Sequence, residues 1–359
     1  MSNELQNFLS LPYEELEELN LKAKEQRKNR VDPGKIQEER LKYLTDEKRI
    51  KAVTVMFSDL EGRMHMLDYD KKFLVKSWDN LTFDGSSIRG FTAQRESDLR
   101  LGMDWGAFYW APSDIFGSGK VLVFGEVIDK DGSPYGADIR GVLKAYANGL
   151  YKKEGYTLNA ANEIEGFLFK GKDAERCYNE TGKFEYVNTG GYYHSLPGDP
   201  LRTFIDKSAE VQRAMGFENE KDHPEVAPSQ FEINYSYGEV VAAADQIQLY
   251  KLICRQVATT MGLTASFLPK PLGDDLAAAV CGDIEPEKES AGRTLVSVAV
   301  ADDLVGEIEL GGIEFASCRG DISHASRPMA AIPARTTSAS PWFRTARPRR
   351  RRCIASSRY

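Results

Sequence analysis

The sequence predicts an α+β fold in which a small β-rich domain precedes a larger domain of mixed helices and strands. The first observation is a pair of strand-like runs at residues 50–56 and 64–67, joined by the turn-forming stretch SDLEGR. The second is the later alternation of strand-like runs with helical patterns, the strongest of which spans residues 240–261.

Composition and charge are typical of a globular protein and exclude several classes. Of 359 residues, 42% are hydrophobic and 28% are charged, and the formal net charge is −7. This balance argues against a nucleic-acid partner, because no excess of basic residues is available to neutralise phosphates. No apolar run approaches about 18 residues and the first residues do not begin a signal peptide, so we expect no membrane span and a cytoplasmic location. The five cysteines form no CxxC pair, which favours thiols over disulfides or zinc ligands.

The first half of the chain divides into an arm and a domain. Residues 1–49 are expected to form a solvated helical N-terminal arm or interface element, highly charged from residue 13 and broken at Asp32-Pro33-Gly34. Residues 50–135 follow as the β-rich domain. Its further strands are expected at residues 107–110 and 121–127, and DKDGSP marks its end.

Residues 136–271 are expected to form the larger domain. A helix should begin at Ile139 and end near Gly155, and a strand with Glu163 and Glu165 follows it. Two further helices are expected at residues 200–215 and 240–261. A last strand, at residues 265–271, is closed by two prolines.

Residues 272–359 differ in character from the rest of the chain. Lysine is frequent up to residue 270, but Lys288 is the only lysine after it, and four consecutive arginines stand at residues 349–352. We expect an atypical tail, disordered where Ser, Ala, Pro and Arg dominate, with a single strand at residues 294–301. The abrupt change in basic residues suggests the hypothesis of a reading-frame shift or a fusion junction in the coding sequence.

Two pairs of glutamates are the strongest sign of chemistry. Glu163 and Glu165 stand two apart in a strand, so their side chains share one face about 7 Å apart. Glu225 and Glu232 flank a second strand-like run. Crowded carboxylates among apolar residues lose solvation and repel one another unless a cation compensates, and hard oxygen ligands suit Mg²⁺ or Mn²⁺. A solvated strand edge is the alternative for either pair alone. Both pairs together favour a metal site.

Several motifs, in the right order over residues 50–271, resemble the glutamine synthetase family, of type I. They are SDLEG at 58–62, FDGSSIRGF at 83–91, EIE at 163–165, GGYY at 190–193, HPEVAPSQFE at 223–232 and FLPKP at 267–271. The resemblance implies an N-terminal β-grasp domain at 50–135. It also implies an incomplete catalytic domain at 136–271, of the creatine-kinase-like α+β type.

The resemblance also implies an activity and the residues that serve it. The reaction is ATP-dependent ligation of ammonia to glutamate through γ-glutamyl phosphate, giving glutamine, with Mg²⁺ or Mn²⁺ bound. Glu165, Glu225 and Glu232 match the three protein ligands of the first metal ion. Glu163 matches one ligand of the second ion. Asp84 matches the aspartate that binds ammonium and helps to deprotonate it, with Ser87 beside it, whereas His223 is as readily a core or loop residue as a substrate contact.

The resemblance stops after residue 271. The family's next segment is Asn-Gly-Ser-Gly-Met-His, which contributes a histidine ligand of the second metal ion, but this chain continues LGDDLAAAV. The family's arginine clamps, its later metal glutamate and its flap glutamate are not matched either. We therefore expect activity to be reduced or lost. We also expect the strands near Glu163 and Glu225 to lack sheet neighbours, with poor solubility or a loosened catalytic half.

Family members assemble as double rings, which implies a homo-oligomer, a dodecamer by resemblance, with active sites between the β-grasp domain of one subunit and the catalytic domain of the next. This arrangement leaves two alternative functions open. One is a non-catalytic assembly or regulatory subunit of such an oligomer. The other is a ligase that joins glutamate to another amine.

Overall fold

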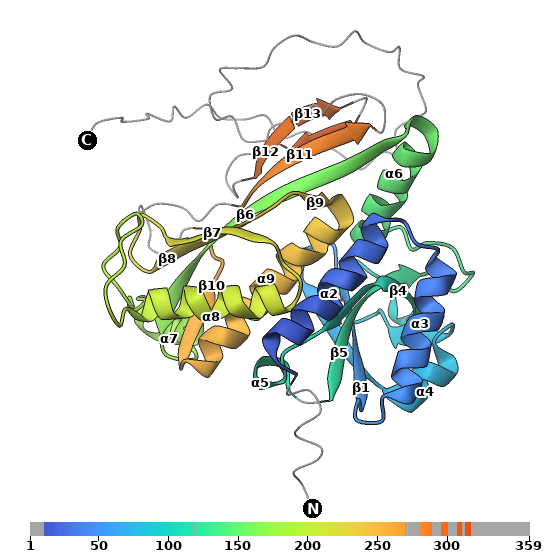
Figure 1. Ribbon diagram of the computed structural model, residues 1–359, viewed down its shortest axis with the longest axis horizontal. Coiled ribbons are helices and arrows are strands. Elements are labelled where there is room, and N and C mark those ends of the chain that lie inside the picture. The colour runs from blue at the N-terminus through green and yellow to red at the C-terminus, as the bar shows by residue number, and fades with distance from the viewer. Residues whose placement is uncertain are drawn as a thin grey trace, which may run out of the picture.

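The computed structural model describes residues 11–117, 119–269, 271, 280–288, 296–300, 307–310 and 313–316. Its helices are α2 (Tyr13–Lys28), α3 (Pro33–Asp46), α4 (Lys71–Ser77), α5 (Ser113–Phe116), α6 (Ile139–Glu154), α7 (Ala174–Thr181), α8 (Pro200–Ala214) and α9 (Val240–Thr260), with a 3₁₀ turn at Gln94–Glu96. Its strands are β1 (Ala52–Ser58), β2 (Met64–Asp70), β3 (Leu81–Asp84), β4 (Asp98–Trp110), β5 (Lys120–Ile128), β6 (Tyr156–Lys170), β7 (Asn219–Pro224), β8 (Gln230–Tyr235), β9 (Gly238–Glu239), β10 (Leu263–Ser266), β11 (Val280–Lys288), β12 (Val296–Val300), β13 (Glu307–Leu310) and β14 (Ile313–Ala316). The predicted α+β class is confirmed (Figure 1).

The β-rich domain is a five-stranded sheet in the order β2-β1-β5-β4-β3, in which β1 and β5 run parallel and the other pairs are antiparallel. Its central strands are buried on both faces, which explains their nearly continuous apolar sequences. Val53 and Val55 pack with residues of α2, α3 and α4, whereas Met56 and Phe124 pack into the core of the second domain.

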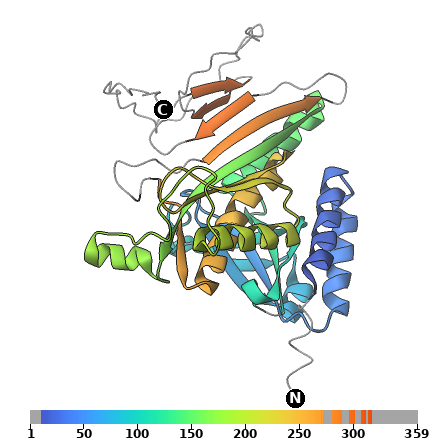
Figure 2. The same ribbon diagram turned by 60° about the vertical axis from the view of Figure 1, so that its left-hand side comes forward.

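The N-terminal arm is part of this packing. Helices α2 and α3 lie side by side against the sheet (Figures 1 and 2). Leu16 is fully buried, and the buried side chain of Asn20 binds the backbone oxygens of Trp110 and Ala214 at 2.8 Å. Only the outer face of the arm is therefore solvated. The break in the arm expected at Asp32-Pro33-Gly34 separates α2 from α3. Asp32 is the N-cap of α3, and Pro33 is at its first helical position.

The second domain is a seven-stranded sheet built around β6. The order is β12-β11-β6-β8-β7, and β9 and β10 also pair with β6. Ile164 and Leu168 of β6 face the core formed by α8 and α9, which includes Phe204 and Leu249. The opposite face of β6 carries Glu163 and Glu165, because side chains alternate along a strand.

Two expectations about the later chain need correction. Residues 156–164 of β6 pair with β11 on one edge, and residues 163–167 pair with β8 on the other. The expectation that the strand of Glu163 lacks sheet neighbours is therefore wrong, whereas β7, next to Glu225, does form a sheet edge. The expected strand at residues 294–301 is present as β12, but the strand at 265–271 is shorter and lies earlier, as β10. Residues 317–359, with the arginine run and the predicted disorder, lie outside the described residues.

A cluster of buried charges joins the two domains. The guanidinium of Arg140, on α6, donates to both carboxylate oxygens of Asp245 on α9, at 2.6 and 2.8 Å, and to Asp104 on β4 at 2.9 Å. Lys144 donates to Asp104 at 3.0 Å and also binds Glu126 on β5. We call these five residues the Arg140 cluster. Within the part of the chain that the structure describes, no helix is long and apolar enough to cross a membrane.

Candidate metal centre

Antiparallel pairing of β6 and β8 brings three of the predicted glutamates onto one face. Glu165 lies directly opposite Glu232, and Glu163 lies opposite Asn234. Directly opposed residues of antiparallel strands point to the same face, with Cβ atoms about 5 Å apart. Amide side chains orient two of the carboxylates: Asn234 donates to Glu163 at 2.8 Å and Gln230 donates to Glu165 at 2.8 Å.

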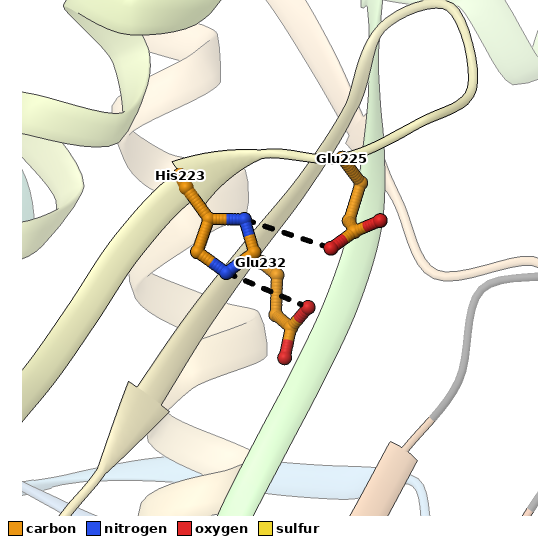
Figure 3. Close-up of side chains that lie close together, drawn as sticks. All are labelled: His223, Glu225 and Glu232. Carbon is orange, nitrogen blue, oxygen red and sulfur yellow. Dashed lines mark ion pairs between the residues drawn. The ribbon is translucent and has the colours of Figure 1, made fainter. Parts of the chain in front are cut away.

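The fourth glutamate comes from the loop after β7. His223, on β7, pairs with Glu232 in the register of β8, and Glu225 follows two residues later. Figure 3 shows the His223 ring between the two carboxylates, with Nδ1 at 3.5 Å from Glu225 and Nε2 at 3.7 Å from Glu232. One ligand atom from each of these three residues lies within 4.8 Å of the others. The structure thus adds His223 to the site that the glutamates predicted.

The loop that carries Glu225 is held by its own backbone. The Glu225 amide donates to the Gln230 carbonyl at 2.9 Å, and Ser229 adopts a left-handed conformation with φ of 64°. Gly190, from the GGYY segment, passes beneath the loop. A Cβ there would lie 2.8 Å from the Val226 carbonyl oxygen, so only glycine permits the approach. The motif is therefore needed to shape the site rather than to supply a ligand.

Charge crowding is the main electrostatic feature of the site. Burial raises the pKa of Glu232 to about 8, and the adjacent carboxylates of Glu225, Glu165 and Glu163 contribute to the rise. Carboxylates that are forced together in this way destabilise their shared ionised state, and a divalent cation would relieve the repulsion. Carboxylate oxygens with one imidazole form a donor set that fits Mn²⁺ or Mg²⁺. The residues present therefore fit the predicted ion.

Two aromatic residues of the GGYY segment cover the histidine. The rings of Tyr192 and Tyr193 meet that of His223 edge to face, at 5.5 and 4.7 Å between centroids. Their hydroxyls lie 2.7 Å apart. The spacing of two residues between His223 and Glu225 does not by itself mark His223 as a ligand, because the polar sequence NEKDHP around it does not identify a strand.

The two residues predicted to serve ammonium lie on the other sheet. Asp84 ends β3, opposite Asp98 of β4, and its side chain is exposed. Its carboxylate accepts from the amide and hydroxyl of Ser86 at 2.8 and 2.7 Å, and these hydrogen bonds lower its pKa. Ser87 is exposed beside it. The resemblance named Ser87 beside Asp84, and in the structure the hydroxyl that donates to the Asp84 carboxylate is that of Ser86.

Comparison with known proteins decides the family. Residues 49–130 match the family model of the glutamine synthetase β-grasp domain, and residues 136–280 match that of the glutamine synthetase catalytic domain. The chain belongs to the glutamine synthetase family.

The catalytic-domain match includes the four glutamates and His223, and the β-grasp match includes Asp84, so the candidate site lies within the glutamine synthetase homology. The glutamine synthetase of Methanosarcina mazei is 36% identical over 230 residues, which are 63% of this chain and 49% of that protein. That of Pyrococcus furiosus is 36% identical over 227 residues, with 63% and 49% covered. The chain spans about half the length of these curated relatives.

Solved structures share the fold of this chain. The cryo-EM structure of Plasmodium falciparum glutamine synthetase superposes with a TM-score of 0.60 at 21% identity, and covers 70% of this chain and 54% of its own. An ADP complex of GmaS superposes with the same TM-score at 20% identity, and the match covers 70% of this chain and 57% of that structure.

Proposed function

We propose that this chain carries a glutamine synthetase site, in which ATP-dependent ligation of ammonia to glutamate gives glutamine through γ-glutamyl phosphate. The observation that supports this most is the convergence of Glu163, Glu165, Glu225 and Glu232 on one face of β6 and β8, within residues that match the family. A bound Mg²⁺ or Mn²⁺ would supply neutralisation of the phosphates of ATP and of the charge that develops during transfer.

The residues of the chain would have the following roles. Glu165, Glu225 and Glu232 would hold the first ion and Glu163 the second, with Gln230 and Asn234 fixing two of these carboxylates. Asp84 would hold ammonium. Its carboxylate is ionised at neutral pH and can stabilise the ammonium charge and accept a proton from it.

We further propose that activity is reduced or lost in this chain. Residues 272–279 read LGDDLAAA where the family continues toward its substrate-binding segment. Each missing phosphate or substrate contact would cost on the order of 10² to 10⁴ in rate.

The test is phosphate release from ATP in the presence of glutamate and ammonium, with glutamine measured directly. We expect weak turnover by the parent chain and none by Glu165→Gln. The control Glu154→Gln changes an exposed glutamate on α6 and should turn over at the rate of the parent. Turnover that survives Glu165→Gln would contradict the proposed site.

A second function, that of a non-catalytic subunit, has one specific observation in its favour. Asp84 is exposed at the end of β3, on a different sheet from the glutamates. It is therefore available to a catalytic domain on another subunit. In that case the chain would complete a partner's site without turnover of its own.

Mixing experiments separate the two functions. A full-length relative that lacks its matching aspartate would be mixed with this chain and assayed for glutamine. The subunit function predicts that activity returns with this chain and fails to return with its Asp84→Asn variant. Glutamine formation by the chain alone would instead favour the catalytic function.

A further inference from the structure

Five lysines lie together outside the candidate metal centre. A cavity of about 600 Å³ opens between the end of α3, the start of β1 and α4, which lie together at the lower right of Figure 1. Its charged lining consists of one acid, Asp70, and five lysines: Lys48, Lys51, Lys71, Lys72 and Lys76. We call this cavity the lysine pocket.

The acids near the lysine pocket are already engaged. Asp70 accepts hydrogen bonds from the backbone amides of Lys72 and Phe73, at 2.9 and 3.2 Å, and caps α4. Glu47, just outside the lining, pairs with the guanidinium of Arg49 at 3.0 Å. The lining therefore holds five ammonium groups against the single carboxylate of Asp70, in a chain whose overall formal charge is −7.

Lys71 is held in place, whereas the other four lysines of the lining are exposed. Its side chain is buried, and its ammonium donates to the Glu47 carbonyl at 2.6 Å. Burial lowers the pKa of Lys71, and the ammonium groups of Lys51 and Lys72 lower it further against the opposing effect of Glu47. Crowding of like charges at a fixed position favours binding of an anion.

Apart from Thr45, the rest of the lining is apolar. Leu44 and Ile50 are fully buried, and Val75 is half-buried beside them. A volume of about 600 Å³ falls in the range of small-molecule sites, which combine apolar walls with a few charged groups. Lysine ammonium groups bind phosphate as point charges, as the lysine of phosphate-binding loops does.

From these observations we propose that the lysine pocket binds a small organic phosphate, with the phosphate on the lysine ammonium groups and an apolar or flat body against Val75 and the aliphatic stems of the lysines. The site is separate from the proposed catalytic chemistry, since it lies on the helical side of the β-grasp sheet. Its ligand can therefore be detected by binding alone, whether or not the chain turns over substrate.

Phenyl phosphate is a suitable probe, because it has an aromatic body and a dianionic head but no nucleotide that would enter an ATP site. We expect saturable binding by calorimetry to the full chain, weaker binding of inorganic phosphate, and none of phenol. The double variant Lys51→Gln/Lys72→Gln should lower the affinity about tenfold, because it removes two of the charges that face the ligand. The control Lys28→Gln/Lys35→Gln removes two exposed charges outside the pocket and should change nothing.

Three results would overturn the proposal: no saturable binding of phenyl phosphate, equal affinity for inorganic phosphate, or unchanged affinity in the Lys51→Gln/Lys72→Gln variant. Thermal melts of the variants show whether they fold. If Lys51→Gln/Lys72→Gln unfolds, the single variant Lys76→Gln on α4 takes its place, with an expected loss of about threefold.

Discussion

Glu232 differs more from an ordinary glutamate than any other carboxylate of the site. Its pKa is about 8, against an ordinary value of 4.5, so in the absence of metal the folded protein binds a proton there that the unfolded chain does not. The stability that comes from this protonated carboxyl is complete below about pH 4.5 and is lost as the pH rises through about 8. The crowding of carboxylates that suits a metal ion therefore lowers the stability of the metal-free protein as the pH rises.

A substitution at this residue tests the electrostatic account. In metal-free buffer with chelator, we expect the stability of the parent chain to fall by several kcal/mol at most between pH 5 and 8, and that of Glu232→Gln to fall less. Urea unfolding at a series of pH values measures both. Glu154→Gln should follow the parent. Parallel profiles for the parent and Glu232→Gln would show that Glu232 titrates normally.

At the level of helices and strands, ion pairs connect neighbouring elements. The Arg140 cluster joins α6, α9 and β4, and the side chains of Arg140 and Asp245 are only 6% and 2% exposed. We expect Arg140→Met to lower the free energy of unfolding by about 3–5 kcal/mol, because it leaves Asp245 and Asp104 buried without their main partner. Denaturant unfolding measures the loss. Arg176→Met, which removes an exposed ion pair on α7, is the control and should cost about 0.5 kcal/mol or less. A similar loss of unfolding free energy in both variants would mean that the Arg140 cluster does not stabilise the contact between the elements it connects.

Elements with a strong pattern could be predicted from the sequence, and those without one could not. The apolar periods of α8 and α9 identified these helices, because one face of each is buried, and the apolar runs of β1 and β5 identified these strands, because both faces are buried. Strand β7 has the polar sequence NEKDHP, which suits an edge and carries no apolar signal. Strand β11 contains Pro286, beyond the last residue that pairs with β12, where a proline is tolerated.

The candidate site was predictable in its glutamates and not in its histidine. Glu163, Glu165, Glu225 and Glu232 could be found from spacing and resemblance, and the register of β6 and β8 brings them together. His223 gains its place only through the pairing of β7 with β8, which the sequence of β7 does not reveal. Asp84 lies on a different sheet from the glutamates because it belongs to the β-grasp domain, as the resemblance implied.

At the scale of the whole molecule, the two domains share one core. Met56, Leu122 and Phe124 of the β-grasp sheet pack with Leu249 and Tyr250 of α9. We therefore expect a fragment of residues 11–135 to be unable to fold stably alone, because it would expose these side chains to water. Circular dichroism melts of the fragment and the full chain test this. A cooperative melt of the fragment near the temperature of the full chain would show that the β-grasp domain is independent.

The most direct test of the central claim is Mn²⁺ binding to the full chain, followed by electron paramagnetic resonance and calorimetry at pH 8. The account predicts saturable binding that Glu165→Gln and Glu232→Gln each weaken at least about tenfold, since each removes one charged ligand, while Glu154→Gln binds as the parent does. Binding that is equal in all four proteins would contradict a metal centre on β6 and β8.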